Sequence, residues 1–123
     1  NKEAIIIDKE HSYFHDFKIY NGKVYMYCTI TLENITDNNL SFSIFAESYK
    51  DKVNGLITNE RMKGYEWEID EKTREIKVTD KKIFFINRKQ KISELNIVFI
   101  GEHGSGNMKD NRNLPDIYIV INK

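Results

Sequence analysis

The sequence is poor in cysteine, proline and glycine, with one, one and six of them among 123 residues. A single cysteine excludes an internal disulfide framework and a cysteine-rich zinc site. The 19 basic residues equal the 19 acidic residues, so the chain lacks the basic excess typical of nucleic-acid-binding domains. The hydrophobic content of 40% is too high for a disordered chain. The length fits one domain, which we expect to span residues 1–123.

Long apolar runs are also missing. The longest run near the start covers residues 4–7. It is shorter than the apolar core of a signal peptide, about 7–15 residues, and than a membrane span of about 20 residues. The chain begins at Asn1 and not at methionine. We therefore expect either that the sequence was shortened or that a targeting segment was removed during maturation.

Isoleucine is the most abundant apolar residue, with 18 copies against five leucines and two alanines. Alanine and leucine are among the best helix formers, whereas β-branched residues favour strands. The composition therefore favours β-structure, although the codon bias of an AT-rich genome would produce the same skew. Periodicity is the stronger evidence.

Two segments alternate strictly between apolar and other residues. Residues 24–32 place five apolar side chains on one face, and tyrosines and threonines on the other, which is typical of a strand with one face on a core. Residues 40–46 repeat the pattern after a turn-forming segment at 33–39. The side chains expected to point inward are Val24, Met26, Cys28, Ile30, Leu32, Leu40, Phe42, Ile44 and Ala46.

Shorter apolar segments predict the remaining strands. They cover residues 5–7, 17–20, 65–70, 76–79, 83–86, 95–100 and 117–121. We expect Gly101 to end one strand and Pro115 to precede the last. Residues 48–64 have little pattern and predict a loop or a short helical turn. Roughly seven to nine short strands without a long helix predict an all-β sandwich or barrel.

Two segments resemble a known family. Residues 28–40 read CTITLENITDNNL, and residues 92–99 read ISELNIVF. These segments lie within residues 27–42 and 83–99, and both regions are similar to bacterial extracytoplasmic immunoglobulin-like domains of the telokin-like group. The resemblance implies a single-domain antiparallel immunoglobulin-like β-sandwich, secreted or lipid-anchored, that acts as a binding or accessory module. The chain departs from antibody-type domains, because Cys28 has no partner cysteine and Trp67 lies too late to be the strand C tryptophan.

Residues 101–116 have the most unusual composition, with three glycines among amide and charged side chains. We predict a ligand-binding loop whose contact residues are Glu102, His103, Asp110 and Arg112. The alternative interpretation is a solvated hairpin between the last two strands. The spacing matches neither a nucleotide-binding fingerprint nor an EF-hand. A serine–histidine pair alone lacks the third member of a triad, so we predict no catalytic residue.

His11 and His15 lie four residues apart, flanked by Glu10 and Asp16. This spacing allows two imidazoles and a carboxylate to share a face, as in a metal site. The sequence offers no third and fourth ligand at a recognisable spacing. We therefore interpret both as surface histidines, and predict no metal and no cofactor.

A basic window lies in residues 81–91, which contain five cations and no acid. Phe84 and Phe85 within it allow an interpretation as a nucleic-acid or anionic surface. We prefer a structural interpretation in which residues 83–86 form a buried strand with solvated lysines at its shoulders. Acidic residues within 66–71 would neutralise the window across strands.

The aromatic residues allow a saccharide-binding platform, since Tyr25 and Tyr27 share the outward face of their strand. The alternative is ordinary cross-strand packing. We expect Trp67 to anchor the core with Tyr65 and Ile69. Cys28 is expected to be a buried, inert thiol.

Together these features predict a non-enzymatic, exported cell-surface or lipoprotein-derived module that binds a protein or cell-envelope ligand. One alternative is a carbohydrate-binding module that uses exposed aromatics. Another is a small metal-dependent hydrolase that uses His11, His15 or His103. We expect no nucleic-acid partner, and membrane attachment only through an anchor outside the sequence. Oligomeric state stays open at this point.

Overall fold

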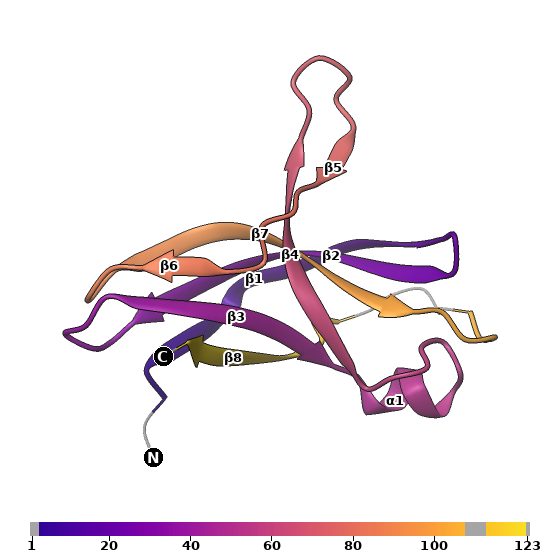
Figure 1. The fold of residues 1–123 in the computed structure, drawn as a ribbon, viewed down its shortest axis with the longest axis horizontal. Helices are drawn as coiled ribbons and strands as arrows, with labels where there is room; N and C mark the ends of the chain where they lie inside the picture. Colours follow the sequence, from indigo (N-terminus) through magenta and orange to yellow (C-terminus); the bar gives the residue numbers. More distant parts are fainter. Residues whose placement is uncertain (1–2, 108–112, 123) are drawn as a thin grey trace.

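The computed structural model describes residues 3–107 and 113–122. It contains eight strands and one short helix (Figure 1). The strands are β1 (Ile5–Tyr20), β2 (Lys23–Asn34), β3 (Leu40–Glu47), β4 (Arg61–Ile69), β5 (Ile76–Val78), β6 (Phe84–Ile86), β7 (Lys91–Glu102) and β8 (Asp116–Asn122), and the helix is α1 (Tyr49–Val53). The all-β prediction is confirmed, and the strand number lies within the predicted range.

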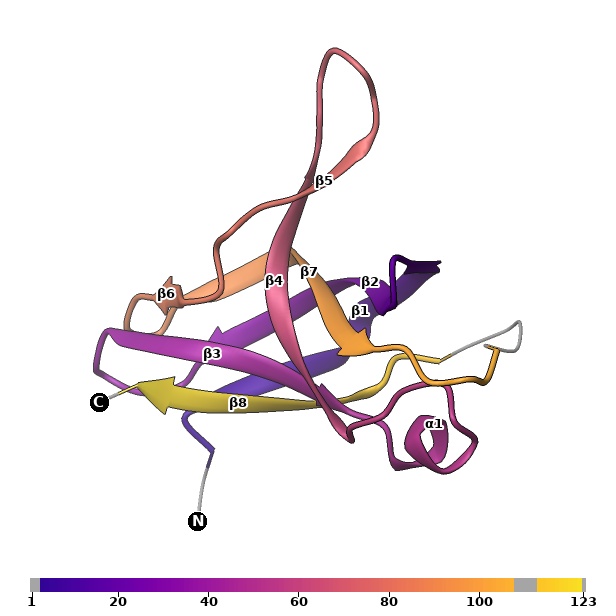
Figure 2. The same cartoon turned by 45° about the vertical axis from the view of Figure 1, so that its right-hand side comes forward.

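All strand pairs are antiparallel, in the order β1-β2-β7-β4-β3-β6, with β5 paired to β4 and β8 to β3. The sheet curls into a half-barrel, so that its two halves face each other like the layers of a sandwich (Figure 2). Among the described strands, β1 pairs only with β2 and β8 pairs only with β3. The half-barrel is therefore open between β1 and β8.

The core fills the inside of this curl. The five inward residues predicted for β2 are all fully buried, as are Phe42, Ile44 and Ala46 on β3, whereas Leu40 is half-buried. The alternation predictions for both strands are therefore confirmed. Cys28 is buried among them, as expected, and forms no disulfide bond.

β1 is longer than the sequence predicts. The pattern indicates two short strands, but one strand runs through Ile5–Tyr20. Its pairing with β2 shifts register between Asp8 and Tyr13 and again between Phe14 and Asp16. These bulges place extra residues in the strand and break the period of two, so that alternation is lost where the strand continues.

Two local predictions need correction. Gly101 does not end a strand, because β7 continues to Glu102; a Cβ at Gly101 would lie 2.9 Å from Met62 Cγ, so the glycine permits close packing there. Residues 83–86 are only partly buried, since Phe84 and Ile86 face the core and Phe85 is 71% exposed. The acids at 66–71 contribute one ion pair to the basic window within the described residues, Lys81 to Glu66 at 3.8 Å.

Asn34 joins two turns at the end of β2. Its fully buried amide donates through Nδ2 to the carbonyl oxygens of Asn38 and Asn87, at 2.8 and 3.0 Å. Its Oδ1 accepts from the backbone and the hydroxyl of Thr36, at 2.9 and 2.7 Å. One side chain thus supplies four hydrogen bonds and fixes the β2–β3 turn against the β6–β7 turn.

Replacing Asn34 by aspartate tests whether its hydrogen bonds hold the two turns together. The carboxylate would keep the two bonds from Thr36 but could not donate to Asn38 and Asn87, and its charge would be buried. We expect Asn34→Asp to lower the free energy of unfolding by about 2–4 kcal/mol, measured by urea denaturation.

Asn39→Asp is the matched control. Asn39 is exposed, and its Oδ1 accepts from the backbone of Arg88 at 2.9 Å, a bond that a carboxylate retains. This control should stay within about 0.5 kcal/mol of the parent. Equal losses in the two variants would contradict the role assigned to Asn34.

Candidate functional site

A continuous row of aromatic rings crosses the outer face of the sheet. Tyr13 and His15 come from β1, Trp67 from β4, and Tyr27 and Tyr25 from β2. Their centroids are 6.5, 6.0, 6.1 and 6.4 Å apart in that order. Trp67 meets both neighbours edge-on, at 88°, whereas Tyr25 and Tyr27 stack at 12°. These are favourable ring geometries, and we call this set the aromatic row.

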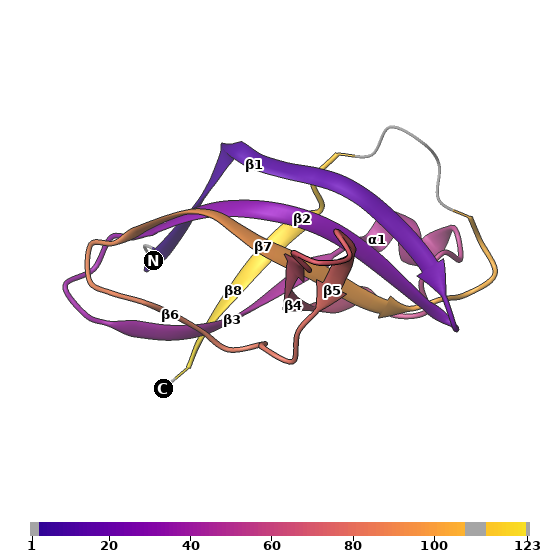
Figure 3. The same cartoon turned by 90° about the horizontal axis from the view of Figure 1, so that it is seen from above.

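Strand register brings these rings together. Alternation along β2 places Tyr25 and Tyr27 opposite to the core face, and Tyr13 pairs with Thr29 of β2. Trp67 pairs with Val78 at the root of the β4–β5 hairpin. This hairpin stands out from the sheet on the side away from β8 in Figures 1 and 2, and Figure 3 shows it from above. The row therefore lies at the foot of a projecting hairpin.

Trp67 is buried with Tyr65 packed near it, as predicted, but in a second core cluster and not in the main one. It forms a second hydrophobic cluster with Tyr27 and Val98, against which Tyr65 packs. Its indole Nε1 donates to the carbonyl oxygen of Cys28 at 2.9 Å, which fixes the ring over the sheet. Ile69, expected beside it, is exposed. Hydrophobicity predicted that Trp67 is buried but could not indicate on which face of the sheet.

A hydrogen-bonded relay lies beside the row. The hydroxyl of Thr29 is 2.9 Å from Asn96 Oδ1 and 2.6 Å from His15 Nε2. A hydroxyl has one proton, and Asn96 Oδ1 can only accept. Thr29 therefore donates to Asn96, and His15 Nε2 must carry a proton that it donates to Thr29. This fixes the tautomer of neutral His15 and leaves its Nδ1 as an acceptor.

The ends of the row are open and its centre is closed. Tyr13 is 48% exposed and His15 is also exposed, while Tyr25 is half-buried. Tyr27 and Trp67 are each 8% exposed. The sequence predicts an aromatic platform on Tyr25 and Tyr27 of β2. The most accessible rings of the row instead lie on β1. Tyr13 was not singled out from sequence, although it is separated from His15 by the spacing of two that puts side chains on one face of a strand.

Tyr27 is the ionisable group of the row whose environment is most altered. Burial raises the pKa of its phenol, and the neighbouring Tyr25 and Asp16 raise it further because they disfavour a second negative charge. The shift moves the phenol further from ionisation at neutral pH, where an ordinary tyrosine is already protonated.

The loop residues predicted from sequence are only partly described. Glu102 forms an ion pair with Lys23 at 2.7 Å, and this bond raises the pKa of Lys23. His103 donates from Nε2 to the carbonyl oxygen of Gly106 at 2.9 Å, so its ring is tied to its own turn. Asp110 and Arg112 lie outside the described residues. The ligand-binding role of these four residues stays a prediction.

His11 and His15 bond to different partners. His11 Nδ1 lies 2.8 Å from Asp8 Oδ2 on the first bulge of β1, and this hydrogen bond lowers the pKa of Asp8. His15 instead bonds Thr29. The four-residue spacing suggested a shared face only for a regular strand or helix, and the bulge removes that regularity. The described part of the chain contains no group of three or more His, Cys, Asp or Glu arranged to hold a metal ion.

Comparisons with protein-family models, curated proteins and solved structures found no match. The immunoglobulin-like resemblance therefore stays a prediction. No helix within residues 3–107 and 113–122 is long and apolar enough to cross a membrane.

The raised pKa of Tyr27 predicts a pH dependence. The native state holds the phenolic proton more tightly than the unfolded state, whose tyrosine has the ordinary pKa of 10.0. The contribution of the Tyr27 phenol to the free energy of unfolding is therefore fully present below pH 10.0, and it is lost as the pH rises above that value toward the native pKa. We expect Tyr27→Phe to make the loss of unfolding free energy above that pH shallower than in the parent.

The measurement is urea denaturation from about pH 8 to about pH 11, a range that brackets the ordinary tyrosine pKa. Tyr49→Phe is the control, because Tyr49 is an exposed residue of α1. Parallel pH profiles for the parent and Tyr27→Phe would contradict the buried, perturbed phenol.

Proposed function

We propose that this protein is a non-catalytic binding module and that its ligand is a saccharide seated on the aromatic row. The observation that carries the proposal is the unbroken contact of five rings from three strands, with exposed rings at the β1 end. Binding sites for small ligands combine aromatic surface with a few placed polar groups. The row has both features.

The chemistry of the row matches that of a sugar ring. The C–H face of a pyranose is apolar and packs on an aromatic face, while its hydroxyl groups need hydrogen bonds. Within the described residues, His15 Nδ1, Asn96 Nδ2 and the hydroxyls of Tyr13 and Tyr25 have no protein partner within hydrogen-bond distance. These groups lie on or next to the row and supply both donors and acceptors.

The direction of the relay supports binding over covalent catalysis. A nucleophilic hydroxyl must give its proton to a base, whereas the Thr29 hydroxyl donates its hydrogen bond to the amide oxygen of Asn96, which is not a base, and accepts a hydrogen bond from His15. Thr29 is also buried. The relay instead orients His15 and Asn96, as a binding site requires.

Location outside the cytoplasm, secreted or membrane-anchored, is part of the same proposal. Its support is the family resemblance of residues 27–42 and 83–99. An intact mass showing a processed or lipidated protein in the envelope or medium fraction of source cells would support export. An unprocessed cytosolic protein would contradict export and leave the binding site untouched.

The second candidate is a protein or envelope ligand bound at residues 101–116, as the loop composition predicts. The strand register favours this candidate: Lys23 pairs with Glu102 of β7 and lies two residues before Tyr25 on β2. The loop therefore begins at the Tyr25 end of the row.

Trp67, the single tryptophan, reports on binding. It contacts His15 and Tyr27, so a ligand on the row should change its emission. A glycan array would select an oligosaccharide, followed by titration monitored by Trp67 fluorescence. We expect Tyr13→Ala to weaken binding about 5–30-fold, since a stacked ring contributes about 1–2 kcal/mol.

The control is Tyr49→Ala, which removes an exposed tyrosine on α1, outside the row. It should bind like the parent. No array signal together with unchanged Trp67 emission would overturn the saccharide proposal, as would equal weakening by the two variants.

A further inference from the structure

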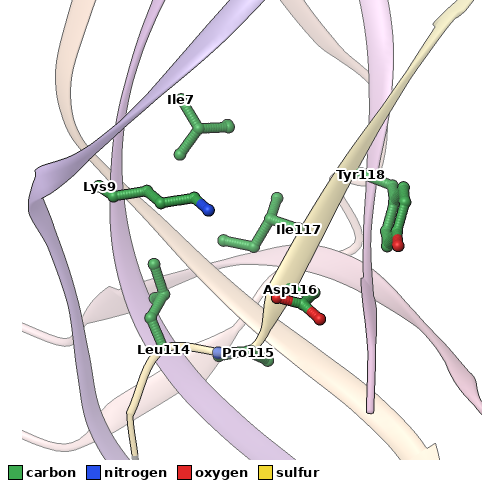
Figure 4. Close-up of a pocket in the computed structure, with 7 residues that line it drawn as sticks. All are labelled: Ile7, Lys9, Leu114, Pro115, Asp116, Ile117 and Tyr118. Atoms are coloured by element: carbon green, nitrogen blue, oxygen red, sulfur yellow. The ribbon is translucent and has the colours of Figure 1, made fainter. Parts of the chain in front are cut away.

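At the opening of the half-barrel, β8 presents an edge that no described strand pairs with. On one side it pairs with β3 through seven consecutive residues, from Asp116 to Asn122. On the other side no described strand pairs with it. An open pocket of about 360 Å³ lies there between β1 and β8 (Figure 4). Its lining comprises Ile7, Lys9, Leu114, Pro115, Asp116, Ile117 and Tyr118.

After Asp116, this edge lacks the features that keep an exposed strand from pairing. Charged side chains, an internal proline or a bulge normally protect such an edge. From Ile117 to Asn122 β8 has no charged residue and no proline, and its register with β3 is uninterrupted. β1, the other strand at the opening, has a bulge and a run of four ionisable residues at 8–11. Of these two strands, only β8 is left ready to accept another.

We propose that β8 pairs antiparallel with β8 of a second copy of this chain, around a two-fold axis at Ile119. This register sets Tyr118 opposite Val120 of the second copy, and Ile117 opposite Ile121. Asp116 then faces Asn122, so the one carboxylate of the strand meets an amide and no like charges oppose each other. Pairs of an aromatic and a β-branched residue are favourable across antiparallel strands, and the interface is isologous.

The exposed fractions of the β8 side chains agree with pairing to β8 of a second copy. Tyr118 and Val120 are 44% and 43% exposed on the outer face. The alternate residues Ile117, Ile119 and Ile121 pack against the core but stay only partly buried. A second β8 would cover part of both sets and satisfy the edge backbone groups that no described residue bonds. The two sheets would continue as β3-β8-β8-β3 across the axis.

A charge exchange tests the register. Tyr118→Lys sets an ammonium opposite an apolar valine, and Val120→Glu sets a carboxylate opposite tyrosine. In the double variant the introduced ammonium of each copy faces the introduced carboxylate of the other, twice per dimer. We expect each single change to raise the dimer dissociation constant at least about tenfold, and the double variant to recover to within about threefold of the parent. Sedimentation over a range of concentrations measures all three against the parent.

Ile69→Lys is the matched control, because Ile69 is an exposed apolar residue of the β4–β5 hairpin, which stands out from the sheet on the side away from β8. It should dimerise like the parent, and circular dichroism should show all variants folded, since the changed side chains point outward. A parent that stays monomeric at every concentration would overturn the proposal. So would a dimer insensitive to Tyr118→Lys, or a double variant no better than the single ones.

Discussion

β2 is the strand on which the molecule depends, because both of its faces are covered. Residues 26–32 are all buried, although only alternate residues face the core. The outward residues include Thr29 and Thr31, whose hydroxyls need partners once they leave water. Thr29 donates to Asn96, while Thr31 donates to the carbonyl oxygen of His11. A strand that is buried on both faces therefore requires hydrogen-bond partners from its neighbouring strands for its buried hydroxyls.

The bulges of β1 meet that requirement. The first bulge brings Ser12 next to Thr31 of β2. The backbone N–H of Thr31 donates to the hydroxyl of Ser12 at 3.0 Å. The second lies at His15, which donates to Thr29 and meets Trp67 edge-on. The same irregularity that satisfies buried polar groups on β2 thus places the exposed rings of the aromatic row. The bulges of β1 are therefore the common cause of the hydrogen bonding to β2 and of the position of the candidate site.

This coupling explains how far the sequence could predict the structure. The strands at 24–32 and 40–46 were predictable because only alternate residues of each strand pack in the main core, which imposes a period of two on local sequence. β1 was not, since each bulge shifts that period. The ring contact between His15 and Trp67 was not predictable either. It depends on which strands become neighbours across the sheet, and no local pattern of either strand contains that information.

The curl of the sheet also separates its two candidate surfaces. The aromatic row lies on β1, β2 and β4, whereas β8 is attached to the sheet through β3 alone among the described strands. Pairing through β8 would leave the row open and give each assembly two rows. Stacking of a few rings on a sugar is a weak interaction, but two linked sites on one polymer bind with an effective concentration that a single site lacks. A repetitive glycan would therefore be retained by the dimer more strongly than by either copy alone, because releasing it requires both rows to open together.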